Sequence, residues 1–225
     1  MSGPTFRDRW AAGEKLASAL DFAVGRKVLV LAIPRGGVPV AERVAAHLDA
    51  PLDVLVTRKL RSPGDPELAV GAVSQDEVMI DPGLVKSTGA SDEYLHGEVA
   101  RETTEVERRT KEYRGGRAPP ELAGTTAVIV DDGVATGSTA RAAIRAARSG
   151  GASSVVLAAP VGSREAIDSL AGIADRVVCL STPEPFFAVG RFYEDFRQVS
   201  DDEVRTILRD ADLRWRNART RLGPG

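Results

Sequence analysis

VIVDDGVATGST, residues 128–139, is the stretch of sequence that decides the fold. Its apolar beginning predicts a buried β-strand over Ala127–Val130. That strand delivers Asp131 and Asp132 to its carboxyl end, which is where ligands bind in open α/β sheets. A helix is predicted to follow from Ser138 to Arg148, so the stretch forms a strand–turn–helix unit with a polar turn.

The turn of this unit has the chemistry of an anion site. Gly133 and Gly137 let the backbone approach a ligand closely. The free N–H groups and the dipole of the following helix favour negative charge, and Thr136, Ser138 and Thr139 add hydroxyl donors. Such a turn would hold a phosphate, with two carboxylates beside it for a polyol or a metal ion. The sequence lacks the glycine patterns of nucleotide P-loops and dinucleotide folds, so a sugar phosphate is the better match.

The same stretch resembles the motif by which type I phosphoribosyltransferases bind 5-phosphoribosyl-1-pyrophosphate (PRPP). That motif is an apolar strand, an acidic pair, small or apolar residues and Thr-Gly-x-Thr. The resemblance implies an α/β fold whose parallel sheet is flanked by helices, with a flexible loop or hairpin insertion and a small C-terminal hood. It implies that Asp131 and Asp132 engage the ribose hydroxyls, directly or through Mg²⁺. The residues expected to hold the 5-phosphate are Ala135, Thr136, Gly137, Ser138 and Thr139.

Two further segments match the family's loops. Arg35-Gly36-Gly37 follows the predicted strand Val28–Ile33, at the position of the family's pyrophosphate loop, and its arginine can bind an anion bidentately. Arg58 and Lys59 end a predicted strand over Leu52–Thr57 and resemble the root of the family's mobile loop. A closing loop would exclude water from the cation-like sugar centre. The alternative for each segment is an ordinary turn at the end of a strand.

An aromatic-rich segment from Pro183 to Phe196 resembles the family's hood, which holds the acceptor base. Phe187 is the expected stacking residue, although an aromatic cluster is more often part of a core. Glu194 or Asp195 is expected to supply the acid of this segment, and Glu194 a further metal ligand beside Asp131 and Asp132. The chain departs from the family's 6-oxopurine enzymes at two positions whose polar groups would contact such a base. Ala135 stands where some members carry an acid, and the preceding strand lacks the lysine that recognises the base.

The rest of the chain alternates strands and helices, as βαβ units do. We expect one domain over residues 1–225, with a core at about 23–60 and 121–182, an insertion at about 61–120, and the hood and a C-terminal helix at about 183–225. The further predicted elements are helices over 5–22, 38–48, 91–113, 164–170 and 205–221, strands over 154–159 and 176–180, and a hairpin over 69–73 and 77–80.

The composition of the chain limits the kinds of partner that the protein is expected to bind. The net charge of −2 supplies no basic field, so no nucleic acid is expected. The N-terminus does not resemble a signal peptide, and the longest apolar run is too short for a membrane helix, so we expect a cytoplasmic protein without a membrane partner. Cys179 is predicted to be buried in a strand, and His47 and His96 to be structural or exposed, with no zinc site.

The resemblance implies an enzyme that transfers the phosphoribosyl group of PRPP to a nitrogenous base, with a purine favoured, Mg²⁺ as cofactor and pyrophosphate as product. Members of the family commonly form homodimers. The alternative is a regulatory protein that binds PRPP without catalysis. Retention of Arg35 and of the basic residues at positions 58 and 59 favours the enzyme, because a sensor does not need an exit for pyrophosphate.

Overall fold

Five parallel strands form the main sheet in the order β2-β1-β6-β7-β8. The computed structural model describes residues 5–65, 68–75 and 77–222. In sheet order, the strands are β2 (Leu52–Val54), β1 (Val28–Ala32), β6 (Thr126–Val130), β7 (Ser154–Val161) and β8 (Arg176–Ser181). Ala32 at the end of β1 pairs with Val130 at the end of β6, so the loops that follow these two central strands are neighbours.

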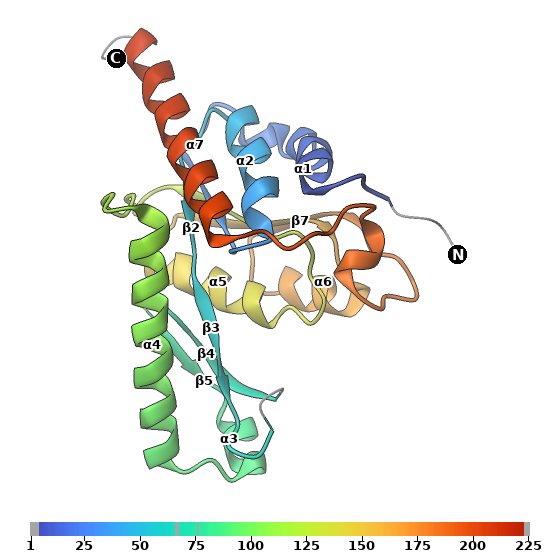
Figure 1. Cartoon of the computed structure of the whole chain (residues 1–225). Helices are drawn as coiled ribbons and strands as arrows, with labels where there is room; N and C mark the ends of the chain where they lie inside the picture. The colour runs from blue at the N-terminus through green and yellow to red at the C-terminus, as the bar shows by residue number, and fades with distance from the viewer. Residues whose placement is uncertain (1–4, 66–67, 76, 223–225) are drawn as a thin grey trace.

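Alternate side chains of the strands enter two separate cores, as the period of a strand requires. In β1, Val28, Val30 and Ala32 face one core, and Leu29 and Leu31 face the other. Helices cover both faces (Figure 1). On the first face lie α1 (Arg9–Ser18), α2 (Gly37–His47) and α7 (Asp201–Leu222), and on the second lie α5 (Ser138–Ser149) and α6 (Arg164–Ala171). The predicted α/β class is therefore confirmed.

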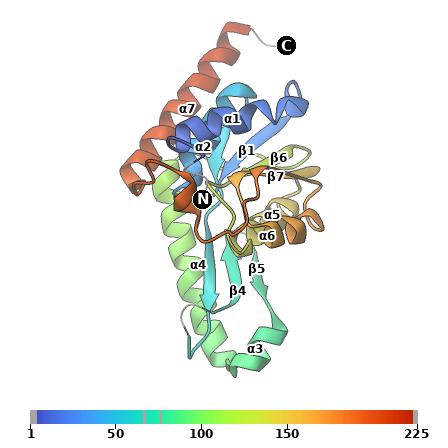
Figure 2. The same cartoon turned by 90° about the vertical axis from the view of Figure 1, so that its right-hand side faces the viewer.

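The insertion forms an arm that extends away from the main sheet (Figure 2). Three antiparallel strands build its own sheet: β3 (Thr57–Arg61), β4 (Ala69–Ser74) and β5 (Val78–Ile80). Two helices complete it, α3 (Pro82–Thr88) and α4 (Asp92–Arg114). The predicted hairpin and the long helix with Ser91 as its N-cap are confirmed, since the Ser91 side chain accepts a hydrogen bond from the N–H of Tyr94. The sequence analysis did not predict α3.

Two predicted boundaries differ. The strand expected over Leu52–Thr57 is two strands, because the chain leaves the parallel sheet after Val54 and Thr57 already pairs with Ser74 in the arm. The basic segment that begins at Arg58 therefore lies in a strand rather than in an open loop. The helix expected over 5–22 is shorter, because Asp8 caps α1 and a 3₁₀ turn, η1 (Asp21–Ala23), follows it.

The C-terminal part also departs from expectation in detail. Helix α7 begins at Asp201, earlier than predicted, because Ser200 and Glu203 form a capping box with reciprocal hydrogen bonds. A second 3₁₀ turn, η2 (Val189–Phe192), lies in the hood. Cys179 is half-buried rather than buried, because β8 is the edge strand of the sheet. No helix among the described residues is long and apolar enough to span a membrane.

Candidate functional site

The acidic turn and the Arg35-Gly36-Gly37 loop are in direct contact at the carboxyl ends of β6 and β1. A Cβ atom on Gly36 would lie 2.0 Å from Oδ2 of Asp132, and one on Gly37 would lie 2.6 Å from the carbonyl oxygen of Val130. Only glycine permits this approach. The structure thus brings two of the three segments expected around PRPP to one place.

Arg9 is a residue of this site that the sequence analysis missed. Its Nε donates to Oδ2 of Asp132 at 2.7 Å, and the two side chains are 10% and 14% exposed. Its Nη1 donates to the carbonyl oxygen of Arg197 at 2.9 Å, and its guanidinium lies 3.9 Å from the centre of the Phe196 ring. One helix-borne cation therefore connects the acidic pair with the segment after the hood. A single arginine in a charged N-terminal segment gives no signal of such a role.

Asp131 lies in an environment that favours its neutral form. Burial, and then the charge of Asp132, raise the pKa of its carboxyl well above the usual range. Its Oδ1 accepts a hydrogen bond from the N–H of Asp132 at 2.9 Å, which opposes part of that rise. A bound cation or a pair of sugar hydroxyls would compensate the same charge. The two adjacent carboxylates are hard oxygen donors, so their chemistry fits Mg²⁺.

Glu194 does not join these carboxylates. Within the described part of the chain, no group of three or more Asp, Glu, His or Cys side chains could hold a metal ion. The reason is local: the N–H of Glu194 binds the carbonyl oxygen of Phe6, while the side chain of Tyr193 takes the inward position and that of Glu194 is exposed. The carboxylates that the structure brings together are Asp131 and Asp132.

The turn before α5 has the geometry of an anion cradle. Gly137 caps the helix in the left-handed conformation, with φ of +77°, which favours glycine. The N–H groups of Ala135, Thr136 and Gly137 have no acceptor among the residues that the structure describes. The hydroxyls of Thr136 and Ser138 lie 3.1 Å apart, and both side chains are exposed. Free N–H groups and hydroxyls at a helix N-terminus are the groups that bind a phosphate.

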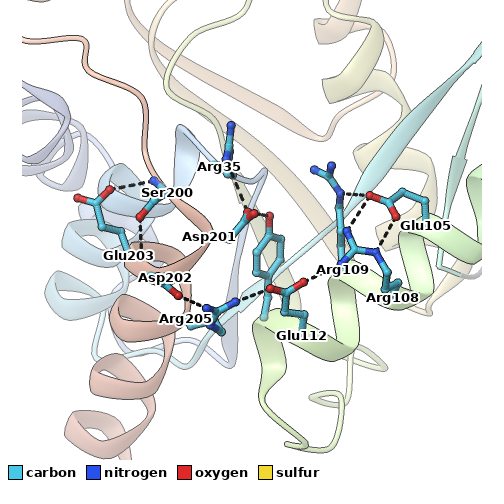
Figure 3. Close-up of polar contacts among 11 residues, drawn as sticks. Arg35, Glu105, Arg108, Arg109, Glu112, Ser200, Asp201, Asp202, Glu203 and Arg205 are labelled. Carbon is cyan, nitrogen blue, oxygen red and sulfur yellow. Dashed lines mark hydrogen bonds and ion pairs between the residues drawn. The ribbon is translucent and has the colours of Figure 1, made fainter.

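Arg35 points to the first turn of α7 (Figure 3). Its Nη1 lies 3.7 Å from Oδ1 of Asp201, which also accepts a hydrogen bond from the Tyr113 hydroxyl at 2.5 Å. Burial, and then this bond to Asp201, raise the pKa of Tyr113 to about 12. Around them, Arg205 of α7 pairs with Glu112 of α4, so the two helices are joined by charge next to the loop.

Arg58 and Lys59 have different surroundings. Nε of Arg58 donates to Oε2 of Glu102 at 2.7 Å, and the Glu102 side chain is only 5% exposed. The side chain of Lys59 is exposed and makes no hydrogen bond or ion pair with any other described residue. Both residues line a cavity of about 510 Å³, together with Ser138 and Thr139 of the phosphate turn.

The hood packs on the acidic turn. A Cβ atom on Gly133 would lie 2.4 Å from Cγ1 of Val189, and the Tyr193 hydroxyl donates to the carbonyl oxygen of Asp132 at 2.6 Å. Phe186 and Phe192 stack with ring centres 5.4 Å apart. Phe187 differs from these partners, because its side chain is 68% exposed. It is thus more exposed than Phe196, and the guanidinium of Arg191 lies 5.3 Å from its ring centre.

Comparison with known proteins agrees with this geometry. The family model described as "Phosphoribosyl transferase domain" matches residues 8–196. The chain therefore belongs to the phosphoribosyl transferase family, a class of pentosyl-transferring enzymes. That match includes Arg9, the acidic turn and the hood.

Particular relatives are similar over most of the chain. The crystal structure of TT1426 from Thermus thermophilus is 42% identical, with a TM-score of 0.80, and the match covers 91% of this chain and 98% of that one. Two Mycobacterium tuberculosis proteins, named "Putative phosphoribosyl transferase" MT0597 and Rv0571c, are each 49% identical over 204 residues. These matches cover 90% of this chain and 46% of each relative, so the chain spans about half the length of these curated relatives.

Proposed function

We propose that the protein transfers the phosphoribosyl group of PRPP to a nitrogenous base and releases pyrophosphate. The observation that carries this proposal is the contact between Gly36 and Asp132. It places an arginine-bearing glycine loop and a carboxylate pair side by side, next to the anion cradle at the start of α5. A sugar flanked by a 5-phosphate and a 1-pyrophosphate needs two anion sites with hydroxyl acceptors between them. The arrangement supports that ligand.

Each group has a role in the proposed reaction. The turn from Ala135 to Thr139 holds the 5-phosphate, and Asp131 and Asp132 accept hydrogen bonds from the ribose hydroxyls or hold Mg²⁺. When bound, Mg²⁺ supplies charge that neutralises pyrophosphate. Gly36 and Gly37 offer close backbone approach to the pyrophosphate. Arg35, Arg58 and Lys59 are the cations proposed to bind it, Arg35 after leaving Asp201.

The proposed reaction depends mainly on the positioning of the two reactants and on the stabilisation of charge in the transition state. The bond between C1 and the pyrophosphate oxygen breaks as the base nitrogen attacks C1, through a transition state that resembles an oxocarbenium ion. The carboxylates of Asp131 and Asp132 lie at the sugar and can stabilise positive charge that develops there. Holding the base and the sugar in the reactive geometry supplies the rest of the rate enhancement.

The proposed acceptor is a flat heterocyclic base, with a purine favoured, stacked on Phe187. The exposed ring of Phe187 and the packing of the hood on Gly133 support this assignment. Glu194 is an exposed residue of the hood, where an acidic side chain can accept a hydrogen bond from the base rather than hold a metal. We also propose that the described segments form one domain with an inserted arm and act as a homodimer.

The decisive experiment is incubation of the protein with PRPP and Mg²⁺ against a panel of purines and pyrimidines, with pyrophosphate release as the readout. We expect release that depends on one base and on Mg²⁺. PRPP binding without release for any base would favour the regulatory alternative. Failure to bind PRPP would reject both functions.

A further inference from the structure

The cavity lined by Arg58 and Lys59 borders the phosphate turn on the side of the arm. It has a volume of about 510 Å³, within the size range of small-molecule sites. Its walls come from the arm sheet, from the start of α3 and from the face of α5 that packs on β4. Figure 2 shows α5 above the strands of the arm. Ser138 and Thr139 belong both to this cavity and to the turn proposed to hold the 5-phosphate.

Three cations converge on the cavity without a carboxylate partner among the described residues. Arg141 and Arg145 lie one helical turn apart on α5, and Lys59 faces them from β3. Within the described chain, the contacts of the two arginines are with Ser169 Oγ at 3.1 Å and with Met79 Sδ at 3.4 Å. Like charges on one helix face repel each other, so a site that gathers three cations beside a single carboxylate, Asp81, favours an anion.

The two other charged residues of the wall already have partners. Arg58 pairs with Glu102, and the carboxylate of Asp81 accepts hydrogen bonds from the N–H groups of Gly83 and Leu84 as the cap of α3. On α4, by contrast, Arg108 and Arg109 both pair with Glu105. Arg141 and Arg145 thus differ from Arg108 and Arg109 in having no carboxylate partner among the described residues.

The opposite wall is apolar. Met79, Ile80, Pro82 and Leu84 line it, and Ile80 is 43% exposed. A ligand that satisfies both walls has at least two negative charges at one end and a planar or apolar body at the other. Inorganic anions match only the cationic wall.

We propose that this cavity binds a small organic anion of that class on Arg141 and Arg145, beside the PRPP site with which it shares Lys59. The site goes beyond the proposed transfer reaction and does not depend on catalysis. Because its walls come from both the arm and α5, the bound anion links the arm to the core beside the phosphate turn. A nucleoside monophosphate and an aromatic phosphate share the required chemistry.

The test measures binding with the residues proposed for PRPP already filled by saturating ribose 5-phosphate and pyrophosphate, because Arg58 and Lys59 line the cavity and are also proposed to bind pyrophosphate. The probes are 1-naphthyl phosphate, AMP, inorganic phosphate and 1-naphthol, which separate the charge from the planar body. We expect one molecule of 1-naphthyl phosphate to bind per chain in the presence of ribose 5-phosphate. Inorganic phosphate and 1-naphthol should each bind at least about tenfold more weakly. The affinity for AMP relative to 1-naphthyl phosphate distinguishes a nucleotide from a general aromatic phosphate.

Variants on both walls locate the site. Arg141→Ala with Arg145→Ala should weaken 1-naphthyl phosphate by about tenfold or more, because it removes two charge-assisted contacts. Met79→Glu, on the arm wall, should do the same by offering Arg145 an internal partner. Arg148→Ala is the matched control, because it removes a charge from the same helix where Arg148 pairs with Asp175. Ribose 5-phosphate affinity and circular dichroism should be unchanged in all three proteins.

Three outcomes would overturn the site: one-for-one competition between 1-naphthyl phosphate and ribose 5-phosphate, unchanged affinity in both wall variants, or no binding at millimolar concentration. None of them bears on PRPP turnover, so failure here is distinguishable from failure of the proposed function.

Discussion

The guanidinium of Arg9 lies 2.7 Å from the carboxylate of Asp132, although the two residues are 123 positions apart in the chain. Removing one partner of a buried ion pair leaves an uncompensated charge, which costs about 3–5 kcal/mol. Arg9→Met should therefore lower the free energy of unfolding by about that amount in urea denaturation. Arg9→Met with Asp132→Asn should recover part of the loss, because no buried charge remains.

Arg7 provides a control for this cycle, since its side chain is exposed and pairs only with its neighbour Asp8 among the described residues. Arg7→Met should leave the denaturation midpoint unchanged. Purely additive effects of the two substitutions at Arg9 and Asp132 would contradict a direct interaction.

The role of Asp131 can be tested without disturbing this ion pair. Asp131→Asn should weaken Mg²⁺-dependent PRPP binding by about tenfold or more, because an amide keeps one acceptor oxygen but lacks the negative charge and the second oxygen of a carboxylate. Titration calorimetry with and without Mg²⁺ measures the effect. Asp168→Asn, an exposed position on α6, should bind PRPP as the unchanged protein does. Equal PRPP affinity in the Asp131 variant would remove this residue from the site.

The two anion sites should respond separately. Arg35→Ala is expected to weaken pyrophosphate and PRPP binding while ribose 5-phosphate affinity stays nearly the same. Thr136→Val and Thr139→Val should weaken ribose 5-phosphate instead, because they delete hydroxyl donors from the turn. Competition binding with the two ligands measures both effects. If Arg35→Ala weakens both ligands equally, the assignment of the loop is wrong.

Asp201 should oppose pyrophosphate binding, because it holds Arg35 at 3.7 Å from its carboxylate. Asp201→Asn removes that competing charge and should tighten pyrophosphate by about two- to fivefold, the scale of a partly exposed ion pair. The gain should disappear when Arg35→Ala is added. Asp202→Asn, the next residue on α7, is the control and should leave pyrophosphate affinity unchanged. A gain that persists without Arg35 would show that Asp201 acts by another route.

Phe187 should act on the acceptor alone. A stacked aromatic pair contributes about 0.5–1.5 kcal/mol beyond its buried area, so Phe187→Ala should raise the acceptor KM by about tenfold. PRPP affinity measured without acceptor should barely change. Steady-state kinetics with the base identified in the panel provide the measurement. If the acceptor KM is unchanged by the substitution, Phe187 does not belong to the base site.

The sequence predicted the parts of the site that depend on local chemistry. The acidic turn and the Arg35-Gly36-Gly37 loop each carry glycines and polar groups at the end of an apolar run, so position along the chain indicated position in the sheet. Arg9 could not be found in this way. Its place depends on α1 packing against α2 and on the bridge between Phe6 and Tyr193, which are long-range contacts.

Other differences have the same origin. The break between β2 and β3 leaves no mark in composition, because Leu55 and Val56 are as apolar as the strand before them. The side chain of Tyr193 points into the protein, so that of its neighbour Glu194 points outward. The segment is irregular, and no pattern in its sequence indicates this alternation. In each case the deciding interaction lies with a distant part of the chain.

The short connection between the two sheets has a mechanical consequence. Leu55 is buried in the core on one side of the main sheet, and Val56 in the core on the other side. These two side chains point in opposite directions and fix the connection to both cores. The arm is therefore attached rigidly to the main sheet rather than through a flexible hinge. A force applied to its strands would be passed to β2 and on to β1, which carries the Arg35 loop at its end.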